Sequence, residues 1–258
     1  MLESTTNQAS GLLALAPQQG PRLMAVVSHG DDRAELPLLW RICAALVDFG
    51  YAVTVLDATV CESEANPGLE QMLECSYSRM AESLDAPAWT VVPAARGVQG
   101  LCAIPAQKSH NLSRLGRMFP HDGVVILYSN AEWLVALLGE SECSPLLPVS
   151  SQKNSLMTSY LALKRLLKNG KLQPTVVNLA QNQRAVAVSL SECAKTFLDY
   201  DVKPINIRTL TEESFSGGDV PLLALRLLEG ALALANTDSL PMTGLGSRVD
   251  RPQPFLSH

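Results

Sequence analysis

The feature that most constrains the fold of this chain is a strand, loop, helix and strand series between residues 23 and 57. Leu23–Ser28 (LMAVVS) is a short apolar run typical of a buried parallel strand, and a polar loop, His29–Glu35, follows it. Pro37–Phe49 carries apolar residues at helical spacing, and its leading proline suits the first turn of a helix. Tyr51–Asp57 (YAVTVLD) predicts a second buried strand. Such a βαβ unit favours a mostly parallel sheet with right-handed crossovers.

The rest of the chain continues this alternation. Apolar runs bounded by turn residues predict five more strands: Trp89–Val92, Gly123–Tyr128, Leu146–Val149, Thr175–Leu179 and Lys203–Ile207. Amphipathic stretches predict further helices: Leu69–Ser83, Asn111–Phe119, Ser155–Lys168, Val186–Asp199 and Val220–Ala235. The last of these is apolar nearly all round, which indicates core packing or, alternatively, a face for a partner or a membrane. We therefore predict an α/β fold with one mostly parallel, twisted sheet and helices on both faces.

Length and composition indicate a single domain. A chain of 258 residues with 47% hydrophobic residues can bury one large core, and no change in composition marks a second domain. Residues 22–236 are expected to form it. The polar residues 1–21 predict a flexible arm, and residues 237–258, rich in Pro, Gly and Ser, predict a disordered tail.

The charge and the distribution of special residues argue against several classes of function. A net charge of −5 without a visible basic patch argues against direct binding of nucleic acid. The sequence has no apolar window long enough for a membrane span, no secretion signal and no basic amphipathic anchor after Ala235, so we expect a cytoplasmic protein without its own membrane anchor. The six cysteines form no CxxC pair and the four histidines are scattered, so no metal site is expected.

The order of these segments resembles the MinD/ParA-type deviant Walker A ATPases, which belong to the SIMIBI class of P-loop proteins. The resemblance begins at MAVVSHGDDRAELPLLWRICAALVDFGYAVTVLDAT and continues through HDGVVILYS, at the Walker B strand, TVVNLAQNQ and CAKTFLDYDVKPINIRTL. It covers roughly residues 23–235. Within the family the chain looks most similar to the flagellar-number regulators FlhG and FleN, through VVNLAQNQ and FLDYDVKPI. The resemblance implies a P-loop NTPase-like fold.

The phosphate-binding loop departs from the family pattern. With Ser28 aligned to the loop start, the family's signature Lys falls on Gly30, its second Lys on Glu35 and its Mg²⁺-binding hydroxyl on Leu36. Its paired glycines fall on Asp31 and Asp32. We expect three carboxylates, on residues 31, 32 and 35, to face the phosphates and repel them. The Walker B Asp is also missing, because Leu127–Asn130 stands there.

Three residues remain as vestigial candidates for cofactor binding. Arg33 is the only cation near the loop, Asp57 matches the family's water-orienting Asp, and Asn178 matches its base-contacting Asn. Each also has an ordinary structural explanation: a solvated loop arginine, an Asp that opens a turn, and an Asn that forms one. We therefore assign no catalytic residue, no metal and no cofactor. The alternative is an atypical ATPase or nucleotide switch that holds ATP with Mg²⁺ in a rearranged site made by these three residues.

The resemblance then implies a catalytically inactive interaction protein, a pseudo-ATPase, that helps to place or regulate a cell-envelope machine. The family suggests a flagellum, cellulose or exopolysaccharide secretion, or a pilus, and a partner could recruit the chain to the inner membrane or the pole. It is expected to form a homodimer or a heteromer with an active relative. An unrelated enzyme is the remaining class, since Ser28–Asp31 brings hydroxyl, imidazole and carboxylate together in sequence, although no G-x-S-x-G elbow is present.

Overall fold

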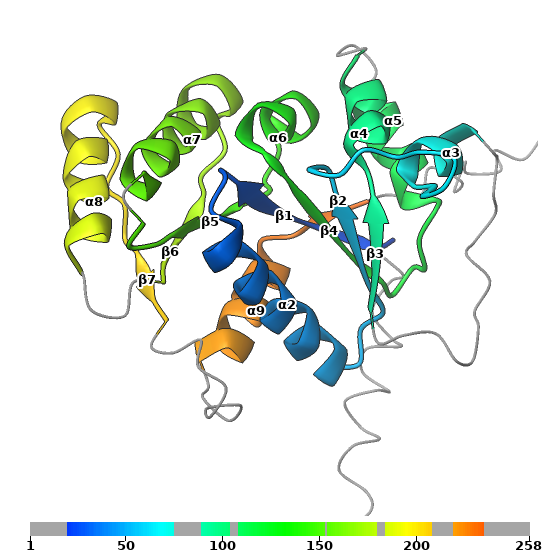
Figure 1. Cartoon of the computed structure of the whole chain (residues 1–258), viewed down its shortest axis with the longest axis horizontal. Helices are drawn as coiled ribbons and strands as arrows, with labels where there is room; N and C mark the ends of the chain where they lie inside the picture. The colour runs from blue at the N-terminus through cyan, green and yellow to red at the C-terminus, as the bar shows by residue number, and fades with distance from the viewer. Residues whose placement is uncertain are drawn as a thin grey trace, which may run out of the picture.

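The computed structural model describes residues 20–74, 89–103, 108–152, 154–179, 184–207 and 219–234 (Figure 1). Within these ranges helices and strands alternate along most of the chain. The strands are β1 (Arg22–Ser28), β2 (Val53–Asp57), β3 (Trp89–Pro93), β4 (Val124–Asn130), β5 (Leu146–Val149), β6 (Thr175–Asn178), β7 (Ile205–Asn206) and β8 (Leu232–Ala233). The helices are α2 (Asp32–Asp48), α3 (Leu69–Glu74), α4 (Ala95–Cys102), α5 (Lys108–Gly116), α6 (Ala131–Leu138), α7 (Ser155–Gly170), α8 (Arg184–Leu198) and α9 (Asp219–Glu229).

The strands form one sheet in the order β3-β2-β4-β1-β5-β6-β7. All neighbours on this path pair in parallel, and β8 adds an antiparallel pairing to β1. Strands β2, β3 and β4 lie on one side of β1, and β5, β6 and β7 lie on the other side. The predicted α/β fold with a mostly parallel sheet is confirmed, and β1 marks the point where the strand order reverses.

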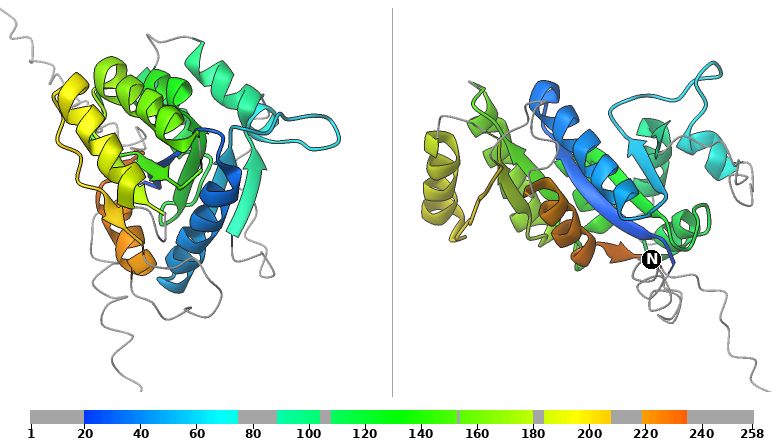
Figure 2. Two further views of the ribbon diagram at one scale, coloured as in Figure 1. Left: turned by 60° about the vertical axis from the view of Figure 1, so that its left-hand side comes forward. Right: turned by 90° about the horizontal axis from the view of Figure 1, so that it is seen from below.

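Helices cover both faces of the sheet. Figure 1 shows α4 to α8 along one face, and α2 and α9 along the other. The first face buries a cluster with residues from β1, β4 and α6, such as Val27, Leu127 and Leu134, and the second buries residues of α2 and α9, such as Ile42 and Leu227. In both views of Figure 2, α2 and α9 lie side by side, and they pack against each other. No helix in the described ranges is both long and apolar enough to cross a bilayer.

Helix α2 begins earlier than the sequence pattern predicts. The expected loop His29–Glu35 is helical from Asp32 onward, and Pro37 lies inside the helix rather than at its start. The early start has a local cause, because the Glu35 side chain turns back and accepts a hydrogen bond from the N–H of Asp31, the residue before the helix. Proline costs little at Pro37, which is exposed, because the carbonyl that loses its partner there can be hydrated.

The carboxyl-terminal prediction was also wrong in part. The expected helix Val220–Ala235 ends at Glu229, and the residues after Gly230 turn to pair with β1. The N–H of Leu234 donates to the carbonyl of Pro21, so the end of this segment is tied to the start of β1. Along α9 one side is buried, as core packing predicts, while Leu222 remains 66% exposed. Of the expected terminal segments, residues 1–19 of the arm and the whole tail, 237–258, lie outside the described residues.

The other helices and strands begin or end within a few residues of their predicted bounds, and two helices, α4 and α6, were not predicted. Neither α4 nor α6 stands out by periodicity, since each is only eight residues long. Helix α6 has a clear amino-terminal cap, because the side chain of Asn130 accepts the N–H of Trp133 at 3.0 Å. The expected helix Leu69–Ser83 is described only as far as Glu74.

A buried glutamate fixes the starts of α3 and α4. Glu62 is 1% exposed, and its carboxylate accepts the N–H groups of Glu70 at 3.2 Å, Arg96 at 2.7 Å and Gly97 at 2.9 Å. These N–H groups lack partners within their own helices, because they lie in first turns. Burial alone would raise the pKa of Glu62, but the hydrogen bonds from Gly97, Arg96 and Glu70 outweigh it and hold the pKa below its ordinary value.

Candidate functional site

The candidate site is the loop that joins β1 to α2. It lies at the carboxyl edge of the sheet, where β1 is flanked by β4 and β5 and the strand order reverses. Ser28, the last residue of β1, pairs with Asn130 of β4, so the loop meets the end of β4 directly. Open parallel sheets bind ligands at such switch points, outside the carboxyl ends of the strands. The position is therefore where this fold places a ligand, and the side chains decide what it can hold.

The backbone N–H groups of the loop are directed at a carboxylate of the same chain. Glu35 lies in the first turns of α2, and its side chain is fully buried. Its Oε1 accepts the N–H of His29 at 3.2 Å and the N–H of Asp31 at 2.9 Å. Loop N–H groups before a helix, together with the helix dipole, form an anion-binding cradle. Here the cradle of His29 and Asp31 N–H groups already contains an anion, the carboxylate of Glu35.

The second oxygen of this carboxylate is held by a buried tyrosine. Tyr128 comes from β4 and is 1% exposed, and its hydroxyl donates to Oε2 of Glu35 at 2.5 Å. Burial is the largest cause that raises the pKa of Tyr128 well above its ordinary value, and the hydrogen bond to Glu35 raises it further. The phenol therefore stays protonated at physiological pH and remains a donor to the carboxylate.

His29 connects this carboxylate to β5 and α7. Its side chain is 3% exposed, with Nδ1 at 3.0 Å from Oγ1 of Thr158 and Nε2 at 2.8 Å from the carbonyl of Pro148. Because a carbonyl only accepts, Nε2 must carry a hydrogen. The same nitrogen lies 3.4 Å from Oε1 of Glu35. The imidazole thus occupies the space between the loop and the next strand, with contacts on both sides.

Asp31 is a second buried carboxylate in the loop. It is 5% exposed, and its Oδ2 accepts a hydrogen bond from the hydroxyl of Ser150, which follows β5. Its other oxygen, Oδ1, and the hydroxyl of Ser129 in β4 are the buried side-chain atoms without a hydrogen-bond partner in the described part of the chain. Buried polar atoms are normally paired, so these two are exceptions to that rule. Among the described residues, no group of His, Cys, Asp or Glu has the arrangement of a metal site.

Comparisons with known proteins add the fold family to this geometry. No protein-family model and no curated protein matches the sequence. Among solved structures, the MinC:MinD cell division protein complex of Aquifex aeolicus gives a TM-score of 0.52 at 12% identity, covering 81% of this chain and 96% of that one. A plasmid partition protein of Borrelia burgdorferi gives 0.51 at 11%, covering 81% and 97%. Cobyrinic acid a,c-diamide synthase of Mycobacterium smegmatis gives 0.53 at 15%, covering 81% and 94%. This chain has the MinD/ParA-type P-loop fold.

In the MinD/ParA-type fold of this chain, two of the three vestigial candidates, Asp57 and Asn178, lie far apart. Arg33 is exposed on the first turn of α2. Asp57 ends β2 and Asn178 ends β6, and the three strands between them put the two residues about 19 Å apart at the usual strand spacing. Oδ1 of Asp57 accepts both the N–H and the hydroxyl of Thr59, at 2.9 and 2.6 Å, as an Asp that opens a turn does.

Asn178 is 3% exposed and donates through its side-chain amide to Oδ1 of Asn206 at 2.9 Å. It thereby joins the ends of β6 and β7. This bond is the ordinary structural role that an Asn at a strand end can have.

One expectation about the loop needs correction. The sequence suggested that Asp31, Asp32 and Glu35 would all face a bound polyanion. Glu35 and Asp31 instead turn inward and are buried, while Asp32 alone is exposed. The reason is that each buried carboxylate finds donors inside the fold, which offsets the cost of removing it from water.

Sequence reasoning missed the partners Tyr128, Ser150 and Thr158. For one of them a signal existed: Tyr128 stands in an apolar run predicted to be a buried strand, and a buried tyrosine hydroxyl needs a polar partner. The partner could not be named, because Glu35 is 93 residues away in the sequence.

Gly30 has a left-handed backbone conformation. Its φ is +91°, which glycine adopts freely and other residues rarely do. A lysine at this position, where the MinD/ParA-type resemblance would place the signature Lys, would be strained by roughly 1 kcal/mol or more. The loop of this chain is therefore shaped for glycine at residue 30.

Proposed function

We propose that this chain is a pseudo-ATPase with the MinD/ParA-type fold, which acts through protein partners and does not switch by ATP hydrolysis. The machine that it helps to place or regulate is a cell-envelope assembly: a flagellum, cellulose or exopolysaccharide secretion, or a pilus. The observation that carries the proposal is the carboxylate of Glu35 in the cradle of the β1–α2 loop. The choice among envelope machines rests on the sequence resemblance alone.

The occupied cradle opposes phosphate binding in two ways. A phosphate would have to take over the N–H groups of His29 and Asp31, which already donate to Glu35. It would also lie beside the Glu35 carboxylate, and two like charges 4 Å apart repel by about 4 kcal/mol at an effective dielectric constant near 20. That energy corresponds to a roughly thousandfold weaker complex.

The site also offers too few oxygen ligands to bind Mg²⁺. Ser129 and Asn130 stand where the Walker B Asp would be expected, and the side chain of Asn130 is used to cap α6. Asp31 is the one carboxylate that carries an unpaired buried oxygen in the described part of the chain, and Ser150 holds its other oxygen. A single buried carboxylate oxygen falls short of the several oxygen ligands that Mg²⁺ requires.

Protein partners are supported by apolar residues beside the site. Met157 and Leu161 lie in the first turns of α7, near the carboxyl edge of the sheet, and are 70% and 52% exposed. Relatives in the MinD/ParA family dimerise across this edge with nucleotide between the subunits. In this chain a homodimer, or a heteromer with an active relative, would form by direct contact instead. Its stability would then be independent of ATP.

The competing function is an atypical ATPase or nucleotide switch that uses Arg33, Asp57 and Asn178. One observation supports this nucleotide switch: Arg33 is exposed near the loop and is free to approach a ligand. A related fold is known to carry nucleotide, since the cobyrinic acid a,c-diamide synthase of Mycobacterium smegmatis was solved with ADP and magnesium.

The test is calorimetric titration of the full chain with ATP and ADP in the presence of Mg²⁺, together with sedimentation with and without nucleotide. An active MinD/ParA-type ATPase serves as the positive control. We expect no nucleotide binding that depends on Arg33 or Asn178 up to millimolar concentration, and the same oligomeric state in both conditions. Binding with a micromolar Kd, abolished by Arg33→Ala or Asn178→Ala, would overturn the proposal in favour of the nucleotide switch.

Two loop variants sharpen this test. Glu35→Gln removes the negative charge but keeps the size of the side chain, and Asp32→Asn removes one charge from the exposed neighbour as a matched control. If the carboxylate in the cradle is what excludes phosphate, Glu35→Gln binds inorganic pyrophosphate more tightly than the wild type does, and Asp32→Asn binds it as the wild type does. Equal behaviour of the two variants would contradict the proposed role of Glu35.

A further inference from the structure

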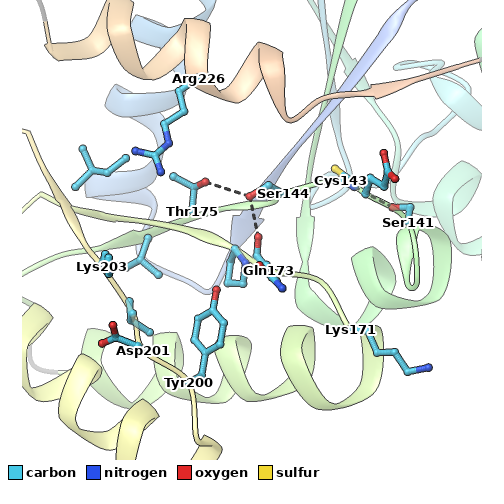
Figure 3. A pocket seen from close by; sticks show the side chains of 15 residues that line it. Ser141, Cys143, Ser144, Lys171, Gln173, Thr175, Tyr200, Asp201, Lys203 and Arg226 are labelled. Carbon is cyan, nitrogen blue, oxygen red and sulfur yellow. Dashed lines mark hydrogen bonds between the residues drawn. The ribbon is translucent and has the colours of Figure 1, made fainter.

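A second polar hollow lies at the opposite edge of the sheet from the candidate site. It has a volume of about 700 Å³ and is lined by residues that precede or begin β5, β6 and β7, with others from the loop before β7 and from α9 (Figure 3). Small-molecule sites in proteins commonly have volumes of about 300–1,000 Å³. The amino edge of a parallel sheet is not where this fold places its nucleotide, so a ligand here would be separate from the P-loop position.

The hydroxyl groups at the floor of the hollow are already paired with each other. Ser144 Oγ donates to the carbonyl of Gln173 at 2.7 Å and lies 3.1 Å from Oγ1 of Thr175. Because the single hydroxyl hydrogen of Ser144 is used on Gln173, Thr175 must donate to Ser144. Neither hydroxyl then has a hydrogen left for a ligand. The floor is fixed, and any donor for a ligand must come from the walls.

Arg226 supplies such donors from the wall formed by α9. Figure 3 shows its guanidinium directed into the hollow, toward Thr175. Within the part of the chain that the structure describes, the guanidinium has no hydrogen-bond or ion-pair partner. Lys171 differs, because it is held by Glu140 at 2.7 Å and points away from the centre of the hollow. An arginine offers several N–H groups in a plane, which match the oxygens of a carboxylate or a phosphate.

A second donor faces Arg226 from the opposite wall. The hydroxyl of Tyr200 points into the hollow in Figure 3, while the carboxylate of Asp201 points away from its centre. Burial raises the pKa of Tyr200, so its hydroxyl stays protonated and can donate. Lys203, also part of the lining, adds a second cation that has no hydrogen-bond or ion-pair partner among the described residues.

We propose that this hollow binds a small molecule through an oxyanion group, a phosphate or a carboxylate, with Arg226 as the main ligand and the Tyr200 hydroxyl as a second donor. The two walls come from α9 and from the loop before β7, so a bound oxyanion would contact both segments. The proposal is independent of the ATPase question, because none of its residues belongs to the β1–α2 loop.

The experiment is calorimetric titration of the full chain with inorganic pyrophosphate and, separately, with citrate. Arg226→Ala is the test variant, and Arg165→Ala, an exposed arginine on α7 that pairs with Glu132, is the control of equal charge. We expect at least one probe to bind, Arg226→Ala to weaken it tenfold or more, Tyr200→Phe to weaken it a few-fold, and Arg165→Ala to leave it unchanged. Binding of pyrophosphate alone assigns a phosphorylated ligand, and binding of citrate alone assigns a carboxylate.

Two results would overturn the proposal. One is the absence of heat with either probe up to 10 mM, roughly the limit at which binding by a few charge-assisted hydrogen bonds is still measurable. The other is an equal loss in Arg226→Ala and Arg165→Ala, which would mean that only overall charge matters. Arg226 is exposed, so neither substitution endangers folding. The same variants also show whether any binding of ATP to the chain occurs here rather than at the β1–α2 loop.

Discussion

Two buried glutamates, Glu35 and Glu62, use the same arrangement, a carboxylate that accepts backbone N–H groups, in two different ways. Each is 1% exposed, and each accepts backbone N–H groups at the start of a helix. Within the described part of the chain, the hydrogen-bond donors to the Glu62 carboxylate are all backbone N–H groups, so Glu62 acts as a clamp between α3 and α4. Glu35 adds the side chains of Tyr128 and His29 and so connects β4, β5 and α7 through one carboxylate.

The difference lies in location as well as in partners. A carboxylate in a cradle of N–H groups is an ordinary structural solution, as Glu62 shows. What distinguishes Glu35 is that its cradle is the loop after β1, at the switch point where open parallel sheets bind ligands. If this comparison is right, removing Glu35 should disturb more of the molecule than removing Glu62.

The largest expected effect is that of Glu35→Ala. The N–H groups of His29 and Asp31 and the hydroxyl of Tyr128 lose their acceptor in a buried place, so the free energy of unfolding should fall by about 3–5 kcal/mol. Urea denaturation followed by circular dichroism measures it. The control is Asp32→Ala, an exposed neighbour expected to change stability by about 0.5 kcal/mol or less. Similar losses in both variants would refute the buried network.

Glu62→Ala should cost less, about 2–3 kcal/mol by the same measurement. It leaves three N–H groups without their acceptor, but residues 63–67 around it are exposed, so water can reach some of these groups. Glu64→Ala, at an exposed position in the same loop, is the matched control. A loss larger than that of Glu35→Ala would reverse the comparison.

The pH dependence of Glu62 gives a sharper test of the clamp. Its pKa is lower in the folded protein than its ordinary value, so its contribution is complete above the pKa of the unfolded chain, near 4.3. That contribution is lost as the pH falls through the lower folded pKa. The stability difference between wild type and Glu62→Gln should therefore shrink between pH 5 and pH 3 in urea denaturation. A difference that stays constant or grows on acidification would show that the carboxylate is not held by these N–H groups.

The smallest expected effect is that of Tyr128→Phe, which removes the hydroxyl but keeps the ring. It should lower the free energy of unfolding by about 1–2 kcal/mol, because a hydrogen bond to a charged group is lost. In a double-mutant cycle with Glu35→Gln the two changes should couple by roughly 1 kcal/mol, as residues in direct contact do. Additive effects would mean that Tyr128 and Glu35 do not share this bond in solution.

Much of the fold could be predicted from the sequence because it depends on local patterns. Apolar runs such as Leu23–Ser28 and Gly123–Tyr128 report burial on both faces of a parallel sheet, and helical spacing in Ser155–Lys168 reports one apolar side. Short helices such as α6 give too few turns for a period to be seen. The pairing of β8 with β1 joins residues that are about 210 positions apart, which no local pattern encodes.

The candidate site was predictable in position but not in its contacts. The β1–α2 loop follows from the βαβ pattern and from the resemblance to MinD/ParA-type proteins. That Glu35 turns inward depends on Tyr128 and His29, whose approach is set by the register of β1 against β4 and β5. From the sequence alone, a glutamate in a loop or first helical turn is more often solvated, so its burial required the structure.

The most direct test of the central claim is the amide spectrum of the isotope-labelled full chain, recorded with and without ATP and Mg²⁺. If the Glu35 carboxylate fills the cradle, the N–H signals of His29 and Asp31 should shift in Glu35→Gln and should not move when millimolar ATP is added to the wild type. Saturable shifts of these two signals on addition of ATP would show that the cradle is open to phosphate and would contradict the account.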